Sequence, residues 1–147
     1  MNFYLNIVDV TNIVARTTLS ILLSSIFGFI IFPISFLVLI GLFGINTLNF
    51  EYITPIIIAS CAFFGNFFSW LKNDYKNIHF KWIISIIIIS ISSAYIGSTK
   101  GMAAERSIIP LGVPELRDTF IWCTTITSFW SMIYWTIMKM LNKTRKL

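Results

Sequence analysis

The sequence predicts an all-α, polytopic membrane protein with four transmembrane helices and an N-terminal amphipathic helix. Of its 147 residues, 56% are hydrophobic and only 12% are charged, which is too few charged side chains to cover a water-soluble globule of this size. The apolar residues are gathered into long runs, and about 20 such residues cross a hydrocarbon core about 30 Å thick. The length leaves room for a single membrane domain, residues 1–147.

Residues 1–16 are too polar to span a membrane. One side of a helix over this segment would carry Asn2, Asn6, Asp9, Asn12 and Arg16, and another side would carry Phe3, Ile7, Val10 and Val14. We expect this amphipathic helix to lie in the membrane interface, or to lead as a continuous helix into the first span.

Residues 17–45 form the first predicted span, and this run is longer than the roughly 20 residues that cross the core. Pro33 lies in its middle and removes a backbone hydrogen-bond donor. We therefore predict a kink at Pro33 or a tilted helix. A second interpretation, two shorter helices broken between Phe32 and Pro33, stays open and would change the number of spans.

The second predicted span covers residues 54–71, with Pro55 in the first turn, where proline is tolerated. Asn66 is the only amide side chain within a predicted span. Because an asparagine in hydrocarbon is costly unless it is paired, we expect Asn66 either to contact another helix or to form part of a polar pathway.

The connection after this span, residues 72–81, holds three lysines and one acid. The excess of positive charge places it in the cytoplasm. Trp70, Tyr75 and Trp82 flank this connection and are expected at the membrane interface. His79, the lone histidine, has no partner at catalytic or ligand spacing, so we assign it no chemistry.

The third predicted span covers residues 82–97 and is rich in isoleucine before it turns polar, with Ser90, Ser93 and Gly97 on one face. Isoleucine is β-branched and favours strands. A lone strand, however, cannot satisfy its backbone hydrogen bonds in lipid, so a helix is predicted.

Charge places the remaining segments. The connection from Gly97 to Asp118 has balanced charges and is expected on the outer face, with at most a short helix over Met102–Ser107. The tail after the last span carries four basic residues and no acid, which are Lys139, Lys143, Arg145 and Lys146. Both termini are therefore expected in the cytoplasm, with the chain in a bacterial inner membrane.

The last predicted span, residues 119–138, carries a polar stripe along one helical face. This polar stripe consists of Arg117, Thr124, Ser128, Ser131 and Trp135, with Thr127 beside it. Hydroxyl side chains in hydrocarbon gain by hydrogen-bonding to other helices, so the stripe marks a side turned toward protein or water. Helix packing within a bundle and a polar pore wall both stay open as interpretations.

The surroundings of this stripe decide between two arrangements. If it packs against the small face of the third span, the two faces satisfy each other within one subunit. If it faces a second copy, oligomers follow.

The sequence carries no pattern typical of catalysis. It has no Ser-His-Asp or Cys-His set, no paired intramembrane carboxylates and no glycine-rich phosphate loop. Cys61 and Cys123 have no neighbouring ligands at metal spacing. The basic residues follow the positive-inside rule, so no nucleic-acid partner is predicted. We expect no enzyme and no cofactor, and the expected partners are the lipid bilayer, further copies of the chain, or another membrane protein.

The second half of the chain, residues 56–147, resembles the three-span phage holins. The stretch FFGNFFSWLKNDYKN followed by KWIISIIIIS is similar to the first span, basic loop and second span of that family, and LGVPELRD is similar to the turn that opens the last span. The span before Pro55 is not part of that pattern, and the outer connection is longer than usual. The resemblance implies self-assembly in the inner membrane into lesions that release a cell-wall-degrading enzyme, with host cell lysis as the result.

The predicted architecture as a whole is also similar to the four-span immunity proteins that protect cells from pore-forming bacteriocins. Those proteins keep both termini inside and bind the helices of the toxin within the membrane, and the likeness is one of architecture alone. A non-catalytic subunit of a larger secretion, defence or exclusion complex is a third class. Both classes stay open beside holin-like permeabilisation.

Overall fold

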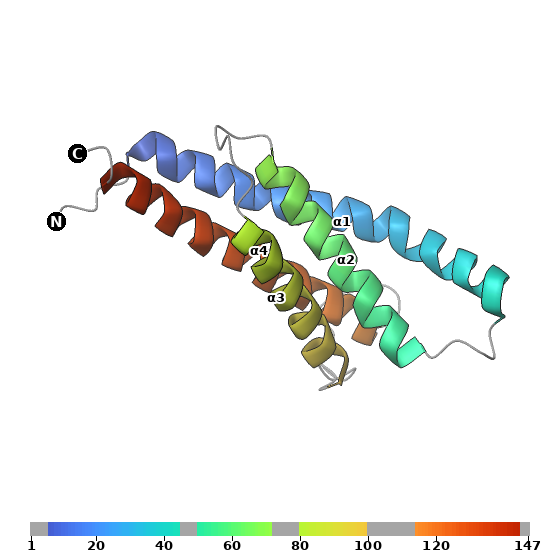
Figure 1. The fold of residues 1–147 in the computed structure, drawn as a ribbon. Helices are drawn as coiled ribbons and strands as arrows, with labels where there is room; N and C mark the ends of the chain where they lie inside the picture. The colour runs from blue at the N-terminus through green and yellow to red at the C-terminus, as the bar shows by residue number, and fades with distance from the viewer. Residues whose placement is uncertain (1–5, 45–49, 72–79, 100–113, 145–147) are drawn as a thin grey trace.

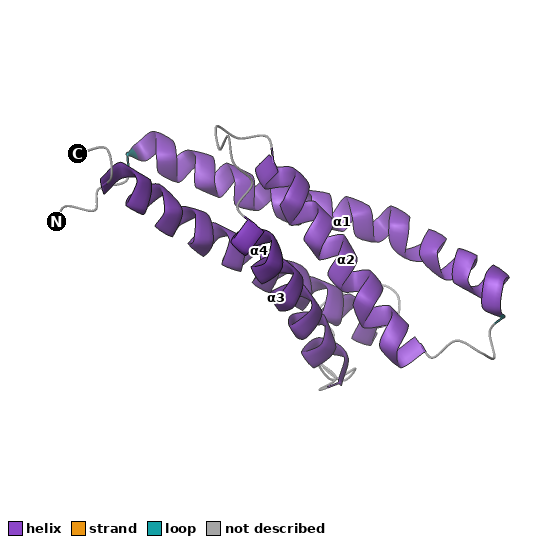
Figure 2. Cartoon of the chain, viewed as in Figure 1, coloured by secondary structure: helices purple, strands orange, loops and turns teal. Residues whose placement is uncertain are grey.

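The computed structural model describes residues 6–44, 50–71, 80–99 and 114–144. These residues form four helices, α1 (Ile7–Phe43), α2 (Phe50–Leu71), α3 (Phe80–Thr99) and α4 (Pro114–Thr144). Figure 2 shows helix as the regular structure throughout these ranges. The all-α class is thereby confirmed for the described part of the chain.

Contacts near the helix ends show that α1 runs antiparallel to α2 and α4. The ammonium group of Lys139, near the end of α4, lies 2.8 Å from the carboxylate of Asp9 at the start of α1. The guanidinium group of Arg16 donates to the carbonyl oxygen of Ser69, near the end of α2, at 2.7 Å. The start of α1 therefore lies beside the ends of both other helices, as Figure 1 shows for α1 and α4.

Helices α3 and α4 also pack antiparallel. Gly97, near the end of α3, lies against Thr119, near the start of α4. Further along, the thiol of Cys123 donates to the carbonyl oxygen of Ser90 at 3.3 Å. Each helix of the described bundle therefore reverses the direction of the one before it.

Among the helices in the described ranges, α1, α2 and α3 are long and apolar enough to cross a membrane. This agrees with the predicted membrane protein. Helix α4 has 31 residues, which is sufficient length, but its charged ends and its hydroxyl residues make it less apolar than the other three helices. Most of those hydroxyl groups are turned into the bundle, as described below.

Helix α1 is a single helix of 37 residues, about 55 Å long at a rise of 1.5 Å per residue. Its residues 7–16 continue directly into the first span, as in the second of the two arrangements considered for the N-terminal segment. It also runs unbroken through Pro33, so the interpretation as two shorter helices broken between Phe32 and Pro33 is wrong. One missing hydrogen bond does not break a helix of this length that packs along α2, and Figure 1 shows no sharp bend in α1.

The other helices extend beyond the predicted spans. Helix α2 begins at Phe50, so Pro55 is buried inside the helix rather than in its first turn. Helices α3 and α4 exceed the predicted ranges 82–97 and 119–138 at both ends. Hydropathy marks the part of a helix that suits hydrocarbon, and polar residues can continue the same helix beyond it.

Several sequence predictions fall in ranges outside the described residues. They concern Asn2 and Phe3 of the amphipathic segment, Tyr75, His79 and the short helix over Met102–Ser107.

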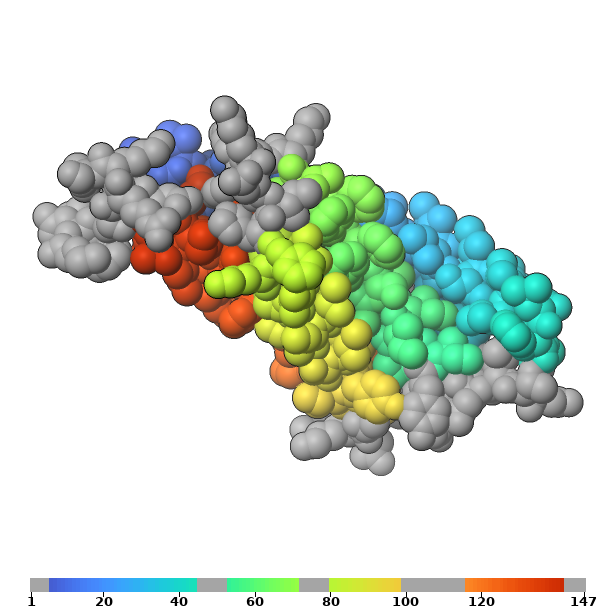
Figure 3. All heavy atoms as spheres, viewed as in Figure 1, coloured from blue at the N-terminus to red at the C-terminus, as the bar shows by residue number. Residues whose placement is uncertain are grey.

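The interior of the bundle combines apolar residues such as Ile58 and Ile86 with many small polar residues, while large apolar side chains cover the exterior. The buried hydroxyl and amide residues are Ser20, Ser24, Asn66, Ser69, Ser90, Ser93, Thr119, Thr124, Thr127, Ser128 and Ser131. Large apolar side chains such as Phe29 and Phe80 are exposed instead, at 88% and 72%. Figure 3 shows the side chains of α1 along one side of the molecule, next to those of α2. This distribution suits hydrocarbon surroundings, where small polar residues gather between helices.

Candidate functional site

The polar stripe of α4 lies in the interior of one subunit. Thr124, Ser128, Ser131 and Trp135 are each at most 3% exposed, and the Arg117 side chain is 14% exposed. These residues recur on the face of α4 that is turned toward the other helices. The stripe is therefore an internal surface of this fold.

The small face predicted on α3 is buried as well. Ser90, Ser93 and Gly97 pack toward α4, where a Cβ on Gly97 would lie 3.1 Å from Cγ2 of Thr119. Of the two arrangements considered for the stripe, the structure has the antiparallel packing within one subunit.

The hydroxyl groups of these two faces bond mostly to their own helices. Ser90 Oγ donates to the carbonyl oxygen of Ile87 at 3.0 Å, and Thr127 Oγ1 donates to that of Cys123 at 2.7 Å. These two hydroxyl groups therefore donate within their own helices, whereas Cys123 and Trp130 supply hydrogen bonds between α4 and α3. Serine and threonine in helices readily donate back to a carbonyl three or four residues earlier. At the interface, these small residues therefore contribute by letting the two helices pack closely.

Asn66 joins α2 to α4 at the centre of the buried face. Its side chain is fully buried, and Nδ2 donates to the carbonyl oxygen of Ala62 at 2.9 Å and to Ser128 Oγ at 3.4 Å. Asn66 is thus a helix–helix contact in this structure. Its Oδ1 atom has no hydrogen-bond partner among the described residues.

Three tryptophans from three helices meet at one end of the bundle and form the tryptophan cluster, Trp70, Trp82 and Trp135. The ring centroids of Trp70 and Trp135 are 5.8 Å apart, and those of Trp82 and Trp135 are 5.4 Å apart. Trp70 and Trp82, which flank the connection after α2, are both only 2% exposed. The ends of α2 and α4 and the start of α3 converge here, so each indole is covered by the other helices.

One sequence signal pointed to this cluster. Trp70 follows Asn66 by one helical turn, and Trp135 belongs to the polar stripe, so both lie on faces that are now seen to be buried. The meeting of these faces depends on the tertiary structure.

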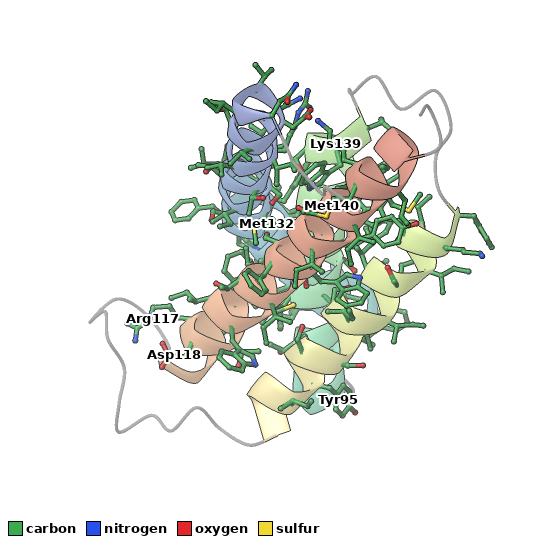
Figure 4. All side chains as sticks on the ribbon, turned by 90° about the vertical axis from the view of Figure 1, so that its left-hand side faces the viewer. Tyr95, Arg117, Asp118, Met132, Lys139 and Met140 are labelled. Carbon is green, nitrogen blue, oxygen red and sulfur yellow. The ribbon has the colours of Figure 1, made fainter. Side chains whose placement is uncertain are left out.

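Charged groups lie at both ends of the bundle. Asp9 and Lys139 pair at the end that holds the tryptophan cluster, and Arg117 and Asp118 pair at 3.1 Å at the other end. Figure 4 shows Arg117 and Asp118 at one end of α4 and Lys139 toward the other. The pair of Asp9 and Lys139 joins residues 130 positions apart, and sequence spacing does not reveal such a contact.

Within the described residues, no group of three or more histidine, cysteine, aspartate or glutamate side chains could hold a metal ion. Cys61 and Cys123 are buried free thiols. What the buried face offers is small side chains, hydroxyl groups and indoles that hold helices together.

Comparison with protein-family models, with curated proteins and with solved structures finds no match for this chain. We therefore infer its function from the geometry of its helices.

Proposed function

We propose that this chain is a small bacterial inner-membrane protein whose four helices form one self-contained unit, and that it acts by contact with another membrane protein. Two roles fit this activity. One is an immunity protein against a pore-forming bacteriocin, and the other is a non-catalytic subunit of a larger secretion, defence or exclusion complex. The burial of Thr124, Ser128 and Ser131 within the subunit carries this proposal.

The buried stripe favours membrane-protein contact over holin-like permeabilisation. A water-filled hole needs a polar wall, and the polar face of α4 is already covered by α2 and α3. To expose it, the subunit would have to separate Asn66 from Ser128 and Cys123 from the carbonyl group of Ser90. The apolar exterior suits lipid, or the helix of another membrane protein, without such a rearrangement.

The second half of α1 provides the surface for this contact. The buried residues of helix α1 all precede position 25. Beyond that position, one ridge of the helix points outward. It consists of Phe29, Pro33, Leu37 and Gly41, and we call it the outer ridge of α1. Phe29 is 88% exposed and Leu37 is 71% exposed. A Cβ on Gly41 would meet nothing within 4 Å, so this position leaves space for the close approach of a partner helix.

The proposal includes the four-span topology, with α4 as the fourth span and both ends of the chain in the cytoplasm. The ion pair of Asp9 and Lys139 supports it, because the start of α1 and the end of α4 then lie on the same side of the membrane. Two ends of a chain lie on the same side of a membrane only when the chain crosses the membrane an even number of times. The basic tail assigns that side to the cytoplasm.

Expression of the chain alone in bacteria tests the proposed activity. A protein that acts by contact leaves growth and membrane potential unchanged, as measured with a potential-sensitive dye. Collapse of the potential after induction, without any further gene, would replace this proposal with holin-like permeabilisation.

Photo-crosslinking tests the proposed surface. A photoreactive residue at Leu37 on the outer ridge should crosslink to a different membrane protein in native membranes. The same residue at the buried Ser128 is the matched control and should crosslink only within the chain. Crosslinks from Leu37 to a second copy alone would show self-association instead.

A further inference from the structure

At one level of the bundle, buried polar atoms from three helices lack hydrogen-bond partners among the described residues. They are Oδ1 of Asn66 and Nε1 of Trp70 on α2, Nε1 of Trp82 on α3, and Oγ of Ser131 on α4. All four residues are at most 2% exposed. Such atoms are rare in proteins, because a buried polar group without a partner is costly.

Neighbouring contacts show that these groups on α2 and α4 lie together. Asn66 reaches Ser128 across the interface, and Trp70 stacks on Trp135, one turn further along α2 and about two turns further along α4. Ser131 lies between Ser128 and Trp135 on the same buried face of α4. Its hydroxyl group is therefore at the level of Asn66 and Trp70.

The third helix closes this site. Trp82, at the start of α3, packs on Trp135 with ring centroids 5.4 Å apart, and Phe67 stacks on Trp82 from α2 at 6.5 Å. The indoles of Trp70 on α2 and Trp82 on α3 thus both contact the Trp135 ring.

The chemistry of the atoms selects the ligand. Nδ2 of Asn66 donates to the carbonyl oxygen of Ala62, and turning the amide would place two acceptors against each other, so Oδ1 must receive a hydrogen bond. The indoles of Trp70 and Trp82 can only donate, while the hydroxyl group of Ser131 can do both. An anion would satisfy the indoles and not Oδ1, and a cation would satisfy only Oδ1 and the hydroxyl oxygen.

We propose that this level of the bundle is a binding site for water, enclosed by Asn66, Trp70, Trp82 and Ser131. Water both accepts and donates, and a buried water typically makes about three hydrogen bonds to otherwise unsatisfied groups. Bound water accepts a hydrogen bond from an indole and donates one to Asn66 Oδ1. Water bound in this site links α2, α3 and α4, at the end of the bundle where α1 carries Arg16. This site is independent of the proposed function.

Water-edited NMR of the full chain in lipid bilayers tests the site, with nitrogen-15 in the indole groups. Single Trp→Phe variants assign the signals. Magnetisation from water should reach the indole protons of Trp70 and Trp82 rapidly. Trp130 is the internal control, because its indole donates to Ser85 Oγ at 2.9 Å.

A soluble paramagnetic chelate separates bound from bulk water. It should leave the signals of Trp70 and Trp82 sharp, because both indole groups are buried at 2% exposure. If magnetisation from water reaches the indole protons of Trp70 and Trp82 no faster than that of Trp130, the site holds no water and the proposal is overturned.

Two variants sharpen the result. Asn66→Leu removes the acceptor and should reduce the transfer to Trp70 several-fold, whereas Ser60→Ala is the matched control on α2, because its hydroxyl group donates only to the carbonyl of Ile56. An unchanged transfer in Asn66→Leu would overturn the proposal. If Asn66→Leu fails to fold, as shown by loss of the Trp130 signal, Ser131→Ala is measured in its place, with the same outcomes.

Discussion

Gly65 allows the backbones of α1 and α2 to touch. A Cβ built on Gly65 would lie 2.6 Å from the Cα atom of Ser24, which is closer than real side chains approach. Ser24 and Ser20 are both fully buried and donate back within α1, at 2.7 Å each. Small side chains on both helices therefore set the distance between α1 and α2.

We expect Gly65→Ala to lower the free energy of unfolding by about 1–3 kcal/mol, because the added methyl group meets backbone that must shift. Gly41→Ala is the matched control, since its methyl group meets nothing within 4 Å, and it should raise the stability by up to about 1 kcal/mol through helix propensity. Unfolding in mixed detergent micelles measures both. Equal stabilities of the two variants would contradict the close approach of α1 to α2.

Thr124 presents a different residue-scale case, a buried hydroxyl group with no hydrogen-bond partner among the described residues. Thr124→Val removes this desolvated group at nearly constant volume, so we expect the free energy of unfolding to rise by about 1 kcal/mol. Thr127→Val is the control, because it loses a hydrogen bond to the carbonyl oxygen of Cys123. A larger loss of stability in Thr124→Val than in Thr127→Val would show that the Thr124 hydroxyl group has a partner.

At the scale of elements, contacts from the far end of the chain anchor the start of α1. Asp9 pairs with Lys139 on α4, and Arg16 bonds to the end of α2. The residues after position 25 of α1, by contrast, present an exposed apolar surface. After position 25, α1 still packs on the bundle through Phe27 and Phe32, while its outer ridge is exposed.

Charge reversal tests the link between α1 and α4. We expect Asp9→Lys to lower the stability by about 0.5–1 kcal/mol, since the pair is partly exposed at 30% and 18% and solvent weakens it. The double variant Asp9→Lys with Lys139→Asp should regain most of this loss, and high salt should reduce the difference. Asp118→Asn serves as the control, because its partner Arg117 is its neighbour in sequence. A double variant no more stable than Asp9→Lys alone would refute the link.

At the scale of the whole molecule, the described helices form an antiparallel bundle whose interior holds both apolar and small polar residues and whose exterior carries large apolar side chains. The start of α1 and the end of α4 lie together, and the basic tail follows α4. This arrangement determines which connections share a side of the membrane once all four helices cross it.

Reporter fusions test the topology. We expect fusions at Asn77 and Leu147 to report a cytoplasmic location and a fusion at Lys100 to report the outer face, because the charge pattern orients the bundle. Each position is fused to two reporters in turn, one active only in the cytoplasm and one active only on the outer face, so that either location gives a positive signal. A cytoplasmic signal at Lys100 would contradict the four-span topology.

Much of the candidate site could be predicted at the scale of residues. Helical spacing picked out the stripe of Thr124, Ser128 and Ser131, and polarity picked out Asn66, and all of these are buried. Hydropathy did not predict the helix ends, because helices continue past the part that suits hydrocarbon. The presence of a proline also did not decide continuity, since α1 runs unbroken through Pro33.

The sequence by itself determined that the chain is helical, that it suits a membrane, and which helix faces are polar, because composition and the 3.6-residue period record these properties locally. Only the tertiary structure decided what covers each face. It turned the stripe of α4 onto α2 and α3, buried Trp70 and Trp82 against Trp135, and joined Asp9 to Lys139. These contacts join residues that are far apart in the sequence, and a periodic pattern shows that a face is distinct without showing what lies against it.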